Sequence, residues 1–122
     1  MHELAITRNI VAMVAEAAQG RPVRRVLLEI GALSGVLADS VRFCFDVVAE
    51  GSPLEGALLE IREPKGRARC RACGVTFDQP TLFTPCICGA RDFERLAGEE
   101  LTIVECEFAA PAEADPIGAP AM

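Results

Sequence analysis

The feature that most restricts the fold is a cysteine-rich segment with little else to hold it together. Cys70 and Cys73 form a C-x-x-C pair, and Cys86 and Cys88 form a C-x-C pair, with twelve residues between the pairs. Residues 65–98 contain few large apolar side chains, so this segment cannot bury a core of its own. We therefore expect its cysteines to hold the segment together in place of a hydrophobic core.

Metal binding is the chemistry that this spacing favours. Four thiolates on two tight turns can surround a tetrahedral d¹⁰ cation such as Zn²⁺. Gly74 and Gly89 directly follow the second cysteine of each pair, where a turn needs positive φ and where backbone N–H groups approach sulfur. The predicted ligands of a structural Zn(II) are Cys70, Cys73, Cys86 and Cys88.

Other interpretations of the cysteines stay open from the pattern alone. A redox dithiol pair, iron in a rubredoxin-like S₄ site and accidental clustering all fit four cysteines. The single residue between Cys86 and Cys88 also departs from the usual C-x-x-C knuckle and tightens the bite of the pair. Cys44 and Cys106 stand apart, and both are expected to be small core residues.

The start of the chain and its apolar runs bear on the compartment. The first residues lack a basic stretch followed by an apolar one, so we expect no signal peptide. No apolar run approaches the roughly 20 residues that a membrane-spanning helix needs. We therefore expect a cytoplasmic protein with no membrane partner, in a reducing compartment where paired cysteines bind metal more often than they form disulfides.

The rest of the sequence predicts an α+β fold. The periodicity of apolar residues predicts helices at 3–19 and 39–49, the second capped by Asp39 or Ser40, and strands near 26–30, 57–63 and 101–108. This order gives a three-stranded sheet packed by two helices, with an inserted small zinc-knuckle domain. The expected division is an α/β domain of residues 1–64 plus 99–108, a zinc-binding insert of 65–98 and a disordered tail of 109–122.

Charge and composition argue against several classes of function. A net charge of −6 and the absence of Trp and Tyr oppose nucleic-acid binding, which needs a basic surface and benefits from stacking aromatics. The chain has one histidine, no Ser/His pairing and no phosphate-cradling glycine loop. We therefore expect no catalytic residues and no enzyme activity.

The single histidine, His2, lies where it can bind a transition metal. The α-amine of Met1, the His2 amide nitrogen and the His2 imidazole can close two fused chelate rings around one cation. The amide nitrogen of Glu3 would complete a square plane, the geometry that Ni(II) and Cu(II) prefer. The alternative is a solvated histidine at a frayed helix end.

Several motifs in one register resemble the HypA/HybF family of hydrogenase nickel-incorporation proteins. The resemblance rests on the Met1-His2-Glu3 start, on EIGALSGV at 29–36, on residues 43–57 with the run GSPLEGA, and on paired cysteines before a final apolar strand. It covers residues 1 to about 108. The departure is the C-x-C pair, which leaves Cys86 as the least secure ligand.

The resemblance implies a nickel metallochaperone. Members of the family bind Ni(II), the transported metal, through the segment that corresponds here to Met1, His2 and Glu3, and hold zinc through paired cysteines. They work with a HypB-type GTPase to load the [NiFe]-hydrogenase large subunit precursor, and in some bacteria they support urease. The expected assembly is a monomer or weak homodimer. The alternative function is a zinc-ribbon protein-interaction module without nickel delivery.

Overall fold

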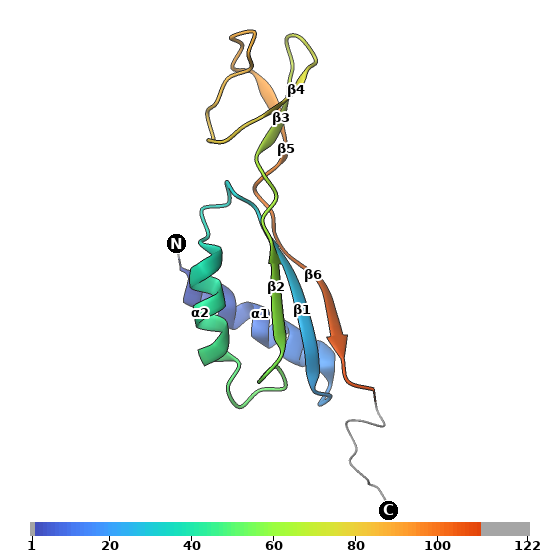
Figure 1. Ribbon diagram of the computed structural model, residues 1–122. Coiled ribbons are helices and arrows are strands. Elements are labelled where there is room, and N and C mark those ends of the chain that lie inside the picture. Colours follow the sequence, from blue (N-terminus) through green and yellow to red (C-terminus); the bar gives the residue numbers. More distant parts are fainter. Residues whose placement is uncertain (1, 111–122) are drawn as a thin grey trace, which may run out of the picture.

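The computed structural model describes residues 2–110, which form two three-stranded sheets and two helices (Figure 1). In chain order the elements are α1 (Glu3–Ala18), β1 (Val23–Ile30), α2 (Ala38–Val48), β2 (Leu58–Arg62), β3 (Arg67–Cys70), β4 (Thr76–Asp78), β5 (Phe93–Ala97) and β6 (Leu101–Phe108). The molecule is elongated, with both helices beside one sheet and the second sheet at the opposite end (Figure 1). The predicted α+β class, with a three-stranded sheet packed by two helices, is confirmed.

The helix-covered sheet has the strand order β2-β1-β6. The β1 and β2 strands run parallel because α2 carries the chain back across the sheet between them. The β6 strand pairs antiparallel with the other side of β1, from Val23 opposite Phe108 to Ile30 opposite Leu101. The last strand of the chain therefore completes a sheet whose first strand lies near the N-terminus, as the sequence predicted.

The core lies between this sheet and the helices. Its buried members come from both helices, β1 and the connecting loops: Ile10, Val11, Val14, Ala18, Val23, Val26, Leu28, Ile30, Val36, Ala38, Val41, Phe45, Ala49 and Leu54. Not every apolar residue of α1 faces this core, because Leu4 and Met13 are exposed. Cys106 packs against this core, and Cys44 is half-buried on α2.

The predicted cap of α2 is wrong. The helix begins at Ala38, and its N-cap residue is Leu37, whose apolar side chain forms no cap hydrogen bond. Neither Asp39 nor Ser40 therefore caps the helix. The Leu37 amide instead donates to a carboxylate oxygen of Glu3 at 3.0 Å. A residue 34 positions earlier in the chain therefore accepts the amide of the N-cap residue itself, as the glutamate of a capping box does.

The face of this sheet that turns away from the helices is covered by charged side chains. Arg25 on β1 donates to Glu60 on β2 and to Glu105 on β6, each at 2.7 Å. Glu60 and Glu105 are the register partners of Leu27 on either side. The ion-paired side chains therefore surround Leu27, which is only 3% exposed although it lies outside the helix-side core.

Residues 65–98, called the insert from here on, hold the second sheet in the order β4-β3-β5, with all pairs antiparallel. These strands did not emerge from the sequence pattern. On β3 only Ala68 and Cys70 are buried, and β4 and β5 have no buried residue, so no apolar alternation marks them.

The insert joins the helix-covered sheet through a junction of close backbone contacts. Gly66 and Gly98 lie against each other, and a Cβ on Gly98 would approach the Gly66 Cα to 2.7 Å. The loop after β1 crosses this point, where the Leu33 amide donates to the Gly98 carbonyl at 2.6 Å and the Ala32 amide donates to the Pro64 carbonyl at 2.9 Å. Only glycine fits at Gly66 and Gly98 because the backbones approach so closely.

The C-terminal tail predicted at 109–122 lies mostly outside the described residues. Ala109 is described, however, and its amide donates to the Pro22 carbonyl at 2.8 Å. Because Ala109 is also buried, the ordered chain continues past the end of β6. No helix among residues 2–110 is long and apolar enough to cross a membrane.

Candidate metal centres

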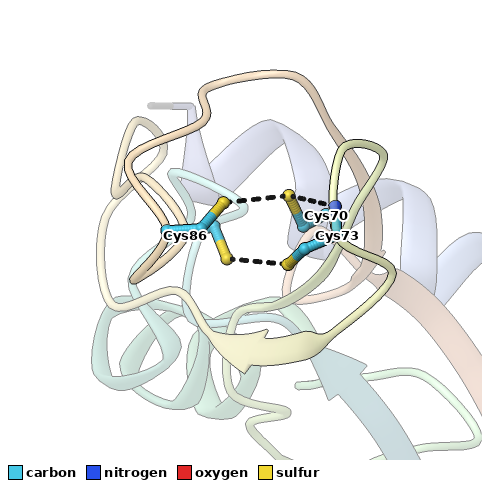
Figure 2. Close-up of side chains that lie close together, drawn as sticks. Cys70, Cys73 and Cys86 are labelled. Carbon is cyan, nitrogen blue, oxygen red and sulfur yellow. Dashed lines mark hydrogen bonds between the residues drawn. The ribbon is translucent and has the colours of Figure 1, made fainter.

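The four cysteines of the insert meet at one point. Their sulfur atoms all lie within 4.8 Å of one another. The Cys70 and Cys88 sulfurs are 3.7 Å apart, and those of Cys73 and Cys86 are 3.6 Å apart. Zn–S bonds of about 2.3 Å place the sulfurs of a tetrahedral site about 3.8 Å apart, so the cluster fits structural zinc. Figure 2 shows the labelled thiols of Cys70, Cys73 and Cys86 directed toward a common space.

Two tight turns position these thiols. The first follows β3, where the Gly74 amide donates to the Cys70 carbonyl at 2.9 Å and the Cys73 amide donates to the Cys70 sulfur at 3.4 Å. In the second turn the Gly89 amide donates to the Cys86 carbonyl at 2.8 Å. Gly74 and Gly89 have φ of +80° and +91°, with open space where a Cβ would lie. Glycine is therefore favoured here by backbone conformation and not by crowding.

The C-x-C spacing does not separate Cys86 from the other thiols. Cys86 is buried in the cluster beside Cys70, while Cys73 and Cys88 lie on its solvent side. The one residue between the paired cysteines, Ile87, projects into solvent. A shortened knuckle is thus accommodated by turning the intervening side chain outward.

The surroundings of the cluster shift the pKa values of Cys70 and Cys86 in opposite directions. Hydrogen bonds from the Cys73 and Ala72 amides lower the pKa of Cys70 to about 7, even though burial opposes this change. The Cys88 amide lowers the pKa of Cys86, but burial and the neighbouring thiols outweigh it and raise that pKa to about 12. Cys70 therefore forms a thiolate more readily than Cys86, and a bound cation has to displace the proton of Cys86.

The second candidate centre is the N-terminal segment, of which Met1 lies outside the described residues. His2 is exposed and is the N-cap residue of α1, and its carbonyl accepts the Ile6 amide at 3.0 Å. The first N–H groups of a helix have no intrahelical acceptor. The Glu3 amide therefore belongs to the set of groups that a metal can engage without breaking the helix.

The side chain of Glu3 is already engaged. Its carboxylate accepts the Leu37 amide, and this hydrogen bond lowers the pKa of Glu3. Its carbonyl also accepts the Thr7 hydroxyl at 2.7 Å. The carboxylate of Glu3 therefore ties the N-terminal segment to the start of α2, and neither of these hydrogen bonds involves the amide nitrogen, the predicted donor of Glu3.

A hollow of about 510 Å³ lies beside this segment. It is lined by His2, Glu3 and Leu4 at the start of α1 and by Asp39, Ser40, Phe43 and Cys44 on α2. The predicted site residues His2 and Glu3 are therefore neighbours of the exposed side of α2. No sequence window indicated this, because the residues that line the hollow from α1 are more than 30 positions from those on α2.

Comparison with known proteins finds relatives that match most of the chain. Residues 1–108 match the family model for HypA, described as hydrogenase/urease nickel incorporation, metallochaperone. The chain is 53% identical over 107 residues to a hydrogenase maturation factor HypA from a Nostoc species, covering 88% of this chain and 95% of that relative. It is 44% identical over 108 residues to HypA of Geobacter sulfurreducens, covering 88% and 98%.

The fold agrees as well. The solution structure of the nickel metallochaperone HypA from Helicobacter pylori superposes with a TM-score of 0.64 at 24% identity, covering 90% of this chain and 99% of that one. The arrangement of two helices and two small sheets is thus a fold already known from a solved structure. This chain is a member of the HypA family of hydrogenase/urease nickel-incorporation metallochaperones.

Proposed function

We propose that this chain binds one Ni(II) at its N-terminus and delivers it during maturation of [NiFe]-hydrogenase. The ligands are the α-amine of Met1, the amide and imidazole of His2, and the amide of Glu3, arranged in a square plane. The observation that carries the proposal is the exposed His2 at the first turn of α1, where helix amides lack acceptors, in a chain of the HypA family.

The cysteine cluster serves a structural role in this proposal. Zinc supplies four metal–thiolate bonds that hold the two turns of the insert together. The proposed ligands are Cys70, Cys73, Cys86 and Cys88, in agreement with their mutual distances. The corresponding division of the chain is a nickel-binding domain of residues 1–64 plus 99–108 and a zinc-binding insert of 65–98.

Delivery requires partners. We infer that the chain works with a HypB-type GTPase and passes nickel to the large subunit precursor of [NiFe]-hydrogenase and, where the cell makes one, to urease. Family membership supports this role, since the relatives are hydrogenase maturation factors. An exposed terminal site suits such a role because the ligands of a receiving protein can replace the ligands of this site one at a time.

The test is a Ni(II) titration of zinc-loaded protein with its native N-terminus. The comparison proteins are His2→Ala and a version extended by several residues before Met1. We expect one nickel per chain with a square-planar absorption band in the native protein, and no such band in either altered protein. The zinc content, measured in parallel, should be the same in all three.

The controls separate the site from general metal binding. Glu3→Gln should keep the band, because it leaves the proposed amide ligand in place. If all three proteins bind nickel alike, the N-terminal site is wrong. If none binds nickel, the interpretation as a zinc-ribbon interaction module replaces the proposal.

A further inference from the structure

Helix α2 carries apolar side chains on the side that faces solvent. Phe43 is 75% exposed and Val47 is 57% exposed, while Val41 and Phe45 of the same helix are buried in the core. Positions 43 and 47 lie one turn apart and share one helix face. Contiguous exposed apolar patches on soluble proteins often mark binding sites.

The exposed side of α2 is continuous with the proposed nickel segment. Phe43 lines the hollow that also holds His2, Glu3 and Leu4. Leu37, just before α2, is also exposed, and its amide is the one that holds the Glu3 carboxylate. Whatever covers this face therefore comes next to His2.

Carboxylates border the same surface. Glu3 and Asp39 line the hollow, and Asp46 is exposed between Phe43 and Val47 along the helix. Charge is also distributed unevenly along the chain. The insert has six Lys and Arg against three Asp and Glu, whereas the other residues of 2–110 have six against thirteen. The helical end of the molecule therefore attracts basic partners.

We propose that Leu4, Leu37, Phe43 and Val47, called here the α2 face, form the docking surface for the protein that works with the nickel-loaded chain. Its occupant is an apolar segment of that partner flanked by Lys or Arg. The apolar side chains cover Phe43 and Val47, and the basic ones meet Glu3 and Asp46, since Asp39 is already paired with Arg42 at 2.6 Å. This inference rests on the proposed function, because it places the partner beside nickel held at His2.

The test measures binding of the full-length, zinc- and nickel-loaded chain to the purified HypB-type GTPase of the same organism by biolayer interferometry. Phe43→Ser should weaken binding about 30-fold or more, as truncation of a central aromatic anchor does. Met13→Ser is the matched control, since Met13 is a 60% exposed apolar residue of α1 outside the α2 face. It should change the dissociation constant by less than about twofold, as a contact outside the interface does.

Two further measurements probe the chemistry of the occupant. Raising the salt concentration should slow association, because exposed charges steer the encounter. An association rate that is indifferent to salt overturns the basic character of the partner segment. Sedimentation of the chain alone probes a second copy as occupant. A dimer that Phe43→Ser converts to monomer overturns the proposal of a partner protein.

The outcomes distinguish this inference from the function on which it rests. Phe43→Ser should keep the nickel titration and absorption band of the unaltered chain. If nickel binds as proposed but the GTPase binds Phe43→Ser as tightly as the unaltered chain, or binds neither, the docking surface is refuted and the nickel site stands. If His2→Ala leaves nickel binding unchanged, the proposed function fails first.

Discussion

Removal of zinc should destabilise the helix-covered sheet, although that sheet contains no cysteine of the cluster. Its strands β2 and β6 are separated by 38 residues, 63–100. With β3 and β5 paired, only the seven residues of 63–66 and 98–100 connect the insert to this sheet. Loop-closure entropy scales as (3/2)RT ln n, so replacing 38 flexible residues by seven changes the free energy of unfolding by about 1.5 kcal/mol.

Far-ultraviolet circular dichroism can measure this effect selectively. Both described helices, α1 and α2, pack on the same sheet, so ellipticity at about 222 nm reports mainly on that part of the molecule. With a urea dependence of about 1–3 kcal/mol per molar, the midpoint should fall by roughly 0.5–1.5 M when a chelator removes zinc. Added zinc should restore it.

A shortened chain provides the control. Replacing residues 67–97 by a tight glycine-containing turn keeps the connection between β2 and β6 short without zinc. The urea midpoint of this variant should lie near that of the zinc-loaded protein and should not change when the chelator is added. Equal urea midpoints with and without zinc in the natural chain, at equal slope, would refute the reasoning. Metal analysis must first verify that the chelator has removed the zinc.

Three other outcomes are expected. Nickel affinity should fall as pH drops below about 6.5, because protons compete for the amine and imidazole, and a pH-independent isotherm contradicts the ligand set. Arg25 lowers the pKa of Glu105 below its usual 4.5, so the ion pair stabilises the fold above that pH, and this contribution is lost as the pH falls. The free energy of unfolding of Arg25→Met should therefore decrease less between neutral and acidic pH than that of the natural chain. Gly66→Ala should cost about 1–3 kcal/mol in thermal unfolding, because its Cβ would collide with the Gln79 carbonyl and the Leu33 side chain, and an unchanged melting temperature excludes the tight junction.

Local periodicity predicted the helix-covered sheet well because its pattern is strong. Val26, Leu28 and Ile30 alternate on β1, and the segment 101–108 resumes that alternation after the cysteines. The strands of the insert escaped prediction for the opposite reason. They carry mainly charged and small residues, and their pairing is held by the turns around the cysteines, so no apolar pattern precedes them.

The site was predictable where its parts lie close together in the sequence. The cysteine spacing and the glycines after Cys73 and Cys88 pointed to a cluster before any coordinates. The contact between Glu3 and Leu37 could not be foreseen, because it joins residues 34 positions apart. Long-range contacts of this kind depend on how α1 and α2 pack, which no local window contains.

The charged cover over Leu27 also has a consequence for solubility. A small open sheet exposes unpaired backbone groups along its outer strands and can add copies of itself edge to edge. Here the outer strands are β2 and β6, and each carries a carboxylate, Glu60 or Glu105, tied to Arg25. Two copies meeting along like edges would bring these carboxylates together, so the ion pairs that shield Leu27 also oppose the pairing of two copies along the same strand.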